Sequence, residues 1–409
     1  MPESENIGLL EGETLNFQAT DIDLDTLSPS DTALNDKYVR GEIRIVTEAA
    51  RYPLNTIAQI VESPSYTLSP EYQRRHRWST ERQSRLIESL IINVPIPPIF
   101  LYEYDYSRYE VMDGLQRLNA IHDFYTDKYP LTGLREWHEL NGRTYSELPE
   151  KVREGIDRRY LSSVILLKET AKSDADALRL KQMVFERLNS GGERLTPQET
   201  RNAVFDGPLN RLCVKLSKTA ALCRLWDLPE PEPEEIAGGL PSETRVENEA
   251  FRRMEDVELV LRFFAYRQKH RLHKSTVPLA TYFDFYLRNG NSFSSGVIQQ
   301  LETLFLNTVD LVEDTFGEKA FWLWRRRGRE PNWGWLERPT TTVYDPLMFV
   351  ISGHLARADA IRAHAQDFQK MMPTFYEKHY TTFEGRNVNP SALVERERKL
   401  QELVSSVLD

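Results

Sequence analysis

The pattern of apolar and polar residues divides the chain into four stretches. Residues 1–42 carry scattered single apolar residues among Asp, Ser and Thr, which is typical of a loosely ordered arm. Over residues 43–228, short alternating runs follow runs with helical spacing, which predicts a domain of the α+β class. Residues 229–245 are rich in Pro, Glu and Gly and predict a stiff linker, and residues 246–409 have the spacing of a mostly helical domain.

The middle of the first domain is expected to hold two strands followed by a helix. Residues 99–104 and 109–112 have the pattern of strands joined by a turn. The second strand runs directly into Asp113 and Gly114, and apolar side chains then recur at helical spacing. Further strands are expected at residues 42–46, 66–68 and 163–167.

Two helix starts carry capping signals. Thr80 and Gln83 have the spacing of a capping box, in which each side chain accepts the free backbone N–H of the other residue. Thr196 and Glu199 have the same spacing, with Pro197 at the first helical position, where its missing N–H costs nothing. We therefore expect Thr80 and Thr196 to cap two helices.

Composition narrows the class of protein. Hydrophobic residues make up 40% of the 409 residues and charged residues 28%, as in a soluble globular protein. No apolar run approaches the roughly 18–20 residues that cross a bilayer, and the first residues do not resemble a secretion signal. Cys213 and Cys223 are too few for a disulfide framework or a four-cysteine zinc site. A cytoplasmic protein without membrane contact is therefore expected.

The net charge of −10 limits how the chain could bind nucleic acid. A protein that coats DNA or RNA usually carries the opposite charge balance. Any such contact must therefore be confined to a local basic face or cleft.

The sharpest candidate site is the stretch from Asp113 to Arg117. A glycine between a strand and a helix lets a ligand approach the backbone, and the free N–H groups of a helix start favour an anion. Arg117 could hold phosphate with two hydrogen bonds, Gln116 could orient a water molecule, and Asp113 could hold Mg²⁺ or act as a base. The structural alternative is a plain strand–turn–helix joint in which Asp113 caps the helix and Arg117 forms a surface ion pair.

A second candidate lies between Tyr72 and Trp78, where cationic side chains stand between aromatic ones. This mixture suits phosphate binding and base stacking, with Arg75 and Arg77 as nucleic-acid contacts. The alternative is a solvated run of charge in which Trp78 packs against the start of the next helix. The residues alone leave both interpretations open.

Two further segments have weaker signals. The glycines at residues 191–192 could form an anion-binding nest, although a plain connection between helices explains them as well. In the second domain, Glu255, Glu258 and Arg262 share a helix face at intervals of three and four. This spacing favours an ion-paired packing face between the two domains.

A basic cluster in the second domain consists of Arg325, Arg326 and Arg327, with Trp324 before it and Trp333 after it. It could contact nucleic acid or a protein partner, or it could be the exposed end of a helix. Other chemistry lacks its motif: the chain has no Gly-x-x-x-x-Gly-Lys-Ser/Thr loop, no His-Asn-His nuclease pattern, no His-Glu-x-x-His and no Gly-x-Ser-x-Gly. An ordinary P-loop nucleotide site is therefore excluded.

Taken together, these segments resemble the DGQQR family. This is a ParB-like domain found in GmrS-type subunits of modification-dependent restriction systems and in the SspE and BrxU defence proteins. The Tyr-Gln-Arg of the family and its following Trp are matched by residues 72–74 and Trp78, and its Tyr-Glu-Val-x-Asp-Gly-x-Gln-Arg by residues 109–117. Two later motifs are similar to residues 189–202 and 256–264, so the resemblance extends from about residue 43 to residue 360.

The resemblance implies a ParB/sulfiredoxin-like core that binds a nucleoside triphosphate (NTP) with Mg²⁺, followed by a helical region. Carried over by position, the catalytic residues would be Asp113, Gln116 and Arg117, and Asp113 would be the metal ligand. The nucleotide would be bound by Tyr72, Gln73, Arg74, Gly114 and Arg117.

The chain departs from the family in two ways. Leu115 stands where the signature has Gln, and because Leu can neither donate to phosphate nor align water, hydrolysis could be slower or absent while binding survives. The HNH-type nuclease motif that restriction members append has no counterpart here. A separate nuclease effector is therefore expected as a partner, together with DNA.

The expected protein is an NTP-binding, NTP-hydrolysing component of a prokaryotic antiphage defence or restriction system that acts on or senses DNA. One alternative is a non-hydrolysing nucleotide switch or DNA-binding adaptor. Another is a metal-dependent DNA nickase that uses the ParB-like site itself. The sequence leaves the oligomeric state open, including a homo-oligomer.

Overall fold

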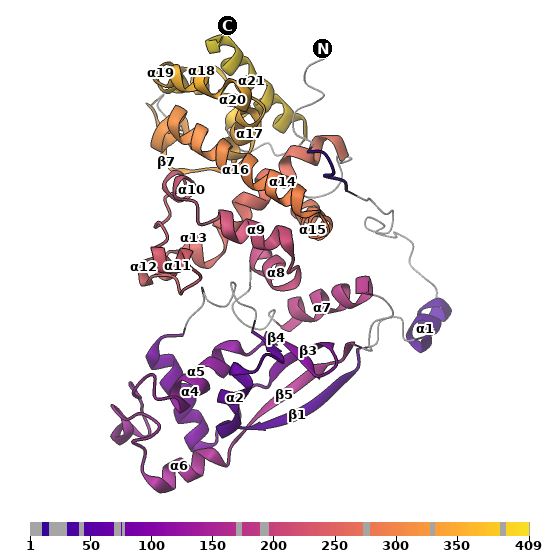
Figure 1. Cartoon of the computed structure of the whole chain (residues 1–409), viewed down its shortest axis with the longest axis vertical. Coiled ribbons are helices and arrows are strands. Elements are labelled where there is room, and N and C mark those ends of the chain that lie inside the picture. Colours follow the sequence, from indigo (N-terminus) through magenta and orange to yellow (C-terminus); the bar gives the residue numbers. More distant parts are fainter. Residues whose placement is uncertain are drawn as a thin grey trace. The chain divides into compact units, whose positions relative to one another are not determined.

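The computed structural model describes residues 10–15, 31–40, 45–68, 75, 78–168, 174–188, 196–272, 279–327, 332–384 and 390–408. The chain forms two compact units (Figure 1). The α/β unit spans Leu24–Val204, and the helical unit combines Met1–Asp23 with Phe205–Asp409. This confirms the expected fold class, a mixed α/β part followed by a mostly helical part. Within the described residues, no helix is long and apolar enough to cross a membrane.

The α/β unit is built on a five-stranded sheet with the strand order β1-β5-β3-β4-β2. β3 runs antiparallel to β4 and parallel to β5, whereas the edge strands β1 and β2 pair with β5 and β4. The strands are β1 (Thr47–Pro53), β2 (Tyr66–Thr67), β3 (Ile99–Asp105), β4 (Arg108–Asp113) and β5 (Tyr160–Leu166).

The expected strand at residues 42–46 is not found where the sequence placed it. Residues 42–44 lie outside the described residues, residues 45–46 have no regular structure, and β1 begins at Thr47. β1 shows no clear apolar alternation, because it is an edge strand whose position is set by seven backbone pairs with β5 rather than by a buried face.

Helices α2, α4, α5 and α6 of this unit contribute apolar side chains to one core together with the strands (Figure 1). Leu86, Ile87 and Leu90 of α4 pack with Leu118 and Phe124 of α5 in the main cluster, as the helical spacing predicted. The helices are α1 (Asp31–Arg40), α2 (Ile57–Glu62), α4 (Thr80–Ile92), α5 (Leu115–Tyr125), α6 (Glu150–Asp157), α7 (Asp174–Leu188) and α8 (Pro197–Val204), with 3₁₀ turns η2 (Leu54–Thr56) and η3 (His138–Leu140).

The two capping predictions have different outcomes. The cap of α4 is Ser79 rather than Thr80: the Ser79 hydroxyl accepts the backbone N–H of Arg82 at 3.3 Å, so the helix begins at Thr80, one residue earlier than it would with Thr80 as the cap. The box before α8 is confirmed. Thr196 Oγ1 accepts the N–H of Glu199 at 3.2 Å, and Glu199 Oε2 accepts the N–H of Thr196 at 2.5 Å.

The helical unit is arranged around α16 (Ser295–Phe316), which contacts α9, α17 and α19. A two-stranded hairpin of β6 (Trp322–Arg327) and β7 (Asn332–Pro339) stands against α19. The other helices are α9 (Pro208–Leu216), α10 (Ala220–Leu225), α11 (Pro233–Ile236), α12 (Glu243–Glu247), α13 (Glu249–Arg252), α14 (Glu255–Leu272), α15 (Leu279–Gly290), α17 (Thr341–Ser352), α18 (Ala358–Ala363), α19 (Ala365–Lys378), α20 (Tyr380–Phe383) and α21 (Pro390–Leu408), with 3₁₀ turns η6 (Gly317–Lys319) and η7 (Leu355–Arg357).

The two units divide at Val204, whereas the sequence placed the end of the first domain at residue 228 and a linker at 229–245. α9 and α10 pack on α14 and α16, so they belong to the helical unit. The Pro-rich stretch is also part of that unit, since Arg245, with a fully buried side chain, pairs with Glu235 at 2.9 Å. Residues 229–245 thus have the composition of a linker but form short helices that belong to the helical unit.

Candidate functional site

The junction between β4 and α5 has the geometry that the sequence suggested. Gly114 follows the strand with φ 98°, a left-handed conformation, and precedes the first residue of the helix. A Cβ at this position would lie 2.4 Å from Cγ2 of Ile99, so the position requires glycine. No side chain caps α5, which leaves its positive end to the backbone N–H groups of the first turn.

The end of β4 is displaced by a β-bulge. Phe100 of β3 pairs with Asp113, but its neighbour Leu101 pairs with Val111, so Met112 is the extra residue. The bulge precedes Gly114 directly and re-aims the last side chain of the strand. The carboxylate of Asp113 is 42% exposed there.

Arg117 lies under this junction and is largely buried, with 11% of its side chain exposed. Its Nη2 donates to Oδ2 of Asp113 at 2.6 Å, and its Nη1 donates to the carbonyl of Pro97 at 2.6 Å. The guanidinium thus joins the end of β4, the first turn of α5 and the proline-rich segment before β3. The structure forms the ion pair of the structural alternative, with two differences: the arginine is buried, and Gly114 rather than Asp113 is the N-cap.

Leu115 and Gln116, the two residues between Gly114 and Arg117, have different surroundings. Leu115 is 6% exposed and belongs to the hydrophobic core of the α/β unit. Gln116 Oε1 accepts the backbone N–H of Trp78 at 3.4 Å. The ring of Trp78 is covered by the guanidinium of Arg82, 4.6 Å from the ring centroid. The structure therefore brings the end of the second candidate segment to the first one.

The rest of the second segment is only partly described. Tyr72, Gln73, Arg74 and Arg77 lie outside the described residues. Arg75 is described and is 1% exposed, so in this conformation its side chain has almost no surface to offer to a nucleic acid. Its burial argues against Arg75 as a nucleic-acid contact.

Of the two segments with weaker signals, the structure describes the one in α14 but not the glycines. The glycines at residues 191–192 lie outside the described residues. In α14, Arg262 pairs with Glu258 at 3.5 Å and, through two hydrogen bonds, with Asp345 of α17. Because both partners belong to the helical unit, this ion pair holds α14 and α17 together within the unit.

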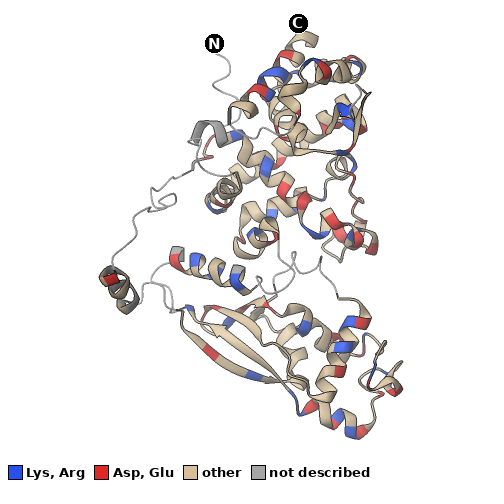
Figure 2. Cartoon of the chain, turned by 180° about the vertical axis from the view of Figure 1, so that it is seen from behind, with Lys and Arg blue, Asp and Glu red and all other residues tan. Residues whose placement is uncertain are grey.

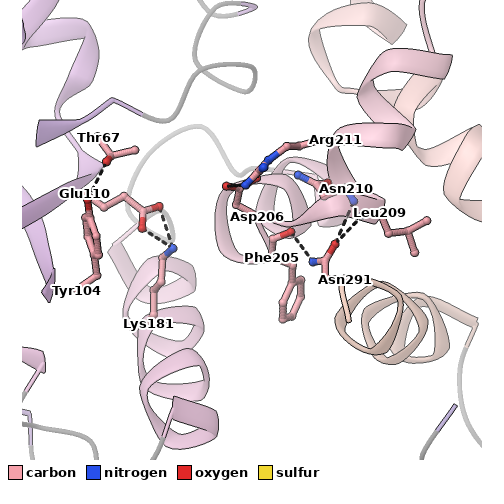
Figure 3. A network of polar contacts seen from close by, with 10 residues as sticks. All are labelled: Thr67, Tyr104, Glu110, Lys181, Phe205, Asp206, Leu209, Asn210, Arg211 and Asn291. Atoms are coloured by element: carbon pink, nitrogen blue, oxygen red, sulfur yellow. Dashed lines mark hydrogen bonds and ion pairs between the residues drawn. The ribbon is translucent and has the colours of Figure 1, made fainter. Parts of the chain in front are cut away.

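A buried ion pair on β4 has no signal in the sequence (Figure 3). Lys181 of α7 donates to both carboxylate oxygens of Glu110, at 2.8 and 2.7 Å, and the two side chains are 9% and 18% exposed. Glu110 stands three residues before Asp113 on the same strand. No sequence spacing connects residues 71 positions apart, so this pair could be found only in the tertiary structure.

A second missed contact lies in the helical unit (Figure 3). Asn291 Oδ1 accepts the backbone N–H groups of Leu209 and Asn210, both at 3.1 Å, and its amide donates to the carbonyl of Phe205. Gly207, the N-cap of α9, has no side chain of its own, and a Cβ there would lie 2.3 Å from Cγ of Asn291. A side chain distant in sequence thus caps α9.

Strong pKa shifts lie away from the junction. In the α/β unit, Tyr125 and Tyr145 both donate to the carboxylate of Asp157 at 3.0 Å, and their rings stack 4.3 Å apart. Burial, followed by the hydrogen bond to Asp157, raises the pKa of Tyr145 to about 12. Both phenols therefore stay protonated at neutral pH and donate to Asp157, which is a structural role rather than acid–base chemistry.

The described residues contain no group of three or more His, Cys, Asp or Glu side chains placed to hold a metal ion. A resident metal held by protein ligands alone therefore has no candidate site in this part of the chain. Mg²⁺ that accompanies a nucleotide needs less, because one carboxylate, phosphate oxygens and water can complete its six ligands. Asp113, half-exposed at the junction, fits this weaker requirement.

The fold and the junction define the first unit as a small α/β domain with an uncapped helix start after a bulged strand. Residues 57–205 of the chain match the family model described as the N-terminal domain of the GmrSD restriction endonuclease. The match ends at the boundary between the two units and covers less than half of the chain. It confirms the resemblance to GmrSD-type proteins over these residues. No curated protein and no solved structure matches the chain.

Proposed function

We propose that the α/β unit binds a nucleoside triphosphate at the start of α5 and that the chain belongs to a DNA restriction or antiphage defence system. The uncapped helix start at Gly114 is the observation that carries the proposal. It offers backbone N–H groups and the positive end of the helix dipole at a position where glycine admits close approach. The match of residues 57–205 supplies the restriction setting.

We propose a role for each residue of the junction. Backbone N–H groups near Gly114 hold the phosphate groups, and Gln116 orients a phosphate oxygen or a water molecule. Arg117 holds the turn through its hydrogen bonds to Asp113 and to the carbonyl of Pro97. Asp113 is the residue that would hold Mg²⁺, which supplies charge neutralisation between the phosphates when it is bound.

The segment around Trp78 completes the site in this proposal. The backbone N–H of Trp78 already contacts Gln116 of the junction. Tyr72, Gln73 and Arg74 precede Trp78 in the sequence by only a few residues. An aromatic ring and an arginine suit the base and the phosphates of a nucleotide. We therefore assign these three residues to nucleotide binding.

A switch that binds nucleotide without hydrolysing it is the second candidate, and Leu115 favours it. The side chain that replaces the Gln of the family signature is buried in the core, so it offers no group to a phosphate or to water. The two candidates differ in one measurement, the release of phosphate from ATP or GTP by the purified chain. A bound nucleotide that is not turned over identifies the switch.

The binding site is tested by titrating the full chain with ATP and GTP, with and without Mg²⁺, in the Asp113→Asn variant. We expect Mg²⁺ to strengthen binding to the unaltered chain and this gain to fall by about tenfold in the variant, since one ligand oxygen is lost. Without Mg²⁺ the variant should bind equally well or better, because the repulsion between carboxylate and phosphate is removed.

Asp105→Asn is the matched control, because Asp105 is exposed at the far end of β3. It should leave both affinities unchanged. An unaltered Mg²⁺ gain in Asp113→Asn would show that Asp113 is not the metal contact. Absence of nucleotide binding to the unaltered chain would overturn the proposed site altogether.

A further inference from the structure

The hairpin of β6 and β7 in the helical unit concentrates two kinds of side chain. Residues 319–339, which include it, carry six Lys or Arg and two Glu, in a chain whose net charge is −10. Four of the seven tryptophans of the chain lie on the same hairpin, at residues 322, 324, 333 and 335. From the sequence, this segment could be either a binding surface or the exposed end of a helix. The structure shows that it is a β-ribbon instead.

The tryptophans hold one face of the ribbon to the helices. Trp324 pairs with Trp335 across the strands, with ring centroids 5.4 Å apart, and its Nε1 donates to Glu377 of α19 at 2.9 Å. Trp333 packs edge-on against Tyr380, 5.4 Å away. The aromatic side chains therefore have a structural use, and they fix the ribbon on a packed support.

The cations of the ribbon are left without carboxylate partners. Lys319, Arg325, Arg326 and Arg338 are exposed, and none of them forms an ion pair within the described residues. Five other exposed arginines of the same unit do pair with Asp or Glu: Arg211, Arg224, Arg253, Arg362 and Arg398. Figure 2 shows how Lys and Arg alternate with Asp and Glu over the chain. The ribbon is thus a local positive surface on an acidic protein.

The acidic residues near the ribbon do not cancel this charge. Residues 318–339 carry six Lys or Arg against three Glu, so the local charge stays positive, and the nearby Glu377 accepts the indole N–H of Trp324. Lys319 lies 5.8 Å from the ring centroids of Trp322 and Trp335, at the edge of a 390 Å³ cavity that Gln369 also lines. Arg327, whose side chain is not described, and Arg329, which lies outside the described residues, add two further cations in the sequence.

We infer that the β6–β7 ribbon binds DNA through its phosphate backbone, with the exposed Arg325, Arg326 and Arg338 as contacts. Arg325 and Arg326 are neighbours on β6 and extend to opposite faces of the strand, so they contact phosphates from both sides of its exposed end. Unpaired guanidinium groups make strong two-pronged hydrogen bonds to phosphate, and release of counterions drives the binding. A two-stranded ribbon also has the width that the major groove of a duplex admits. This site does not depend on the nucleotide site proposed for the α/β unit.

The test measures the affinity of the full chain for fluorescent duplex DNA over a range of salt concentrations, without nucleotide. The Arg325→Ala, Arg326→Ala double variant should bind at least about tenfold more weakly at low salt. The slope of log affinity against log salt should flatten by about one to two, since each lost phosphate contact removes about 0.9 from the slope. The Arg211→Ala, Arg253→Ala double variant removes the same charge elsewhere on the unit and should retain both values.

Single-stranded DNA of the same sequence and an acidic peptide are the comparison ligands. Equal losses for duplex and single strand in the ribbon variant support recognition of the phosphate backbone, and a greater loss for the duplex supports groove binding. The inference is overturned if the ribbon and control variants bind DNA alike. It is also overturned if the peptide binds more tightly than DNA and only its affinity depends on Arg325 and Arg326.

Discussion

One glycine determines the course of the chain at the candidate site. Gly114 combines a positive φ with contact to Ile99 at a distance that no Cβ tolerates. Around it, Arg117 ties the junction together by donating to Asp113 and to the carbonyl of Pro97. The same side chains thus serve the fold and, in our proposal, the ligand.

Gly114→Ala should lower the free energy of unfolding of the α/β unit by about 2–4 kcal/mol, because it adds left-handed strain to overpacking against Ile99. Gly142→Ala is the control: its φ is also positive, at 85°, but an added Cβ would meet nothing within 4 Å. It should cost only about 1 kcal/mol. Urea unfolding with hydrogen exchange of the β3–α5 peptides measures both, and equal losses would contradict the steric argument.

Among the elements, α4 acts as an anchor for the segment between α5 and α6. Glu88 of α4 accepts three backbone N–H groups at a single oxygen, those of Arg135, Glu136 and Trp137, at 2.8–3.0 Å. Its neighbour Ser84 accepts the N–H of Thr132 at 3.0 Å. A segment with little regular structure is thus held by two side chains one helical turn apart.

Glu88→Gln should destabilise the α/β unit by about 1–2 kcal/mol, since three charge-assisted hydrogen bonds become neutral ones. Glu81→Gln, on the same helix, is the matched control, because Glu81 is 55% exposed and pairs only with Arg85 in the described residues. It should cost less than about 0.5 kcal/mol. The amides of residues 135–137 should exchange faster only in Glu88→Gln; unchanged exchange there would argue against the anchor.

In the molecule as a whole, a segment near the start of the chain belongs to the helical unit, which is otherwise formed by the second half of the chain. Glu13 has a fully buried side chain within the helical unit, where Arg267 donates to it at 3.0 Å and Tyr286 at 2.6 Å. Burial, followed by the charge of Glu13, raises the pKa of Tyr286 well above its usual value, so the phenol remains a donor. Residues that the sequence assigned to a loose arm thus include part of the core of this unit.

Glu13→Gln should lower the stability of the helical unit by about 3–5 kcal/mol, because it removes the carboxylate that faces the buried Arg267. The double change Glu13→Leu, Arg267→Met should cost less, since it removes both charges. Glu11→Gln, at an exposed position two residues away, should have little effect. Thermal unfolding of the full chain distinguishes these outcomes, and a double variant as unstable as Glu13→Gln would refute a pairing of charges.

The sequence alone determined the elements whose signals are local. Apolar spacing predicted α4, α5 and the β3–β4 hairpin, and the spacing of Thr196 and Glu199 predicted the start of α8. Both signals are local, because caps and periodicity depend on residues only a few positions apart. The strand–glycine–helix junction at Gly114 was predicted from a short local motif. The resemblance to GmrSD-type proteins was predicted from several such motifs that occur in the order of the family.

Contacts between residues far apart in the sequence became visible only in the folded chain. The tertiary structure paired β1 with β5, placed α9 and α10 in the helical unit, and turned the basic cluster at Arg325 into a ribbon. It also buried Glu110 with Lys181 and Glu13 with Arg267. Strand pairing, ion pairs and caps across such separations leave no period in the sequence, because the free energy that selects them comes from packing between elements.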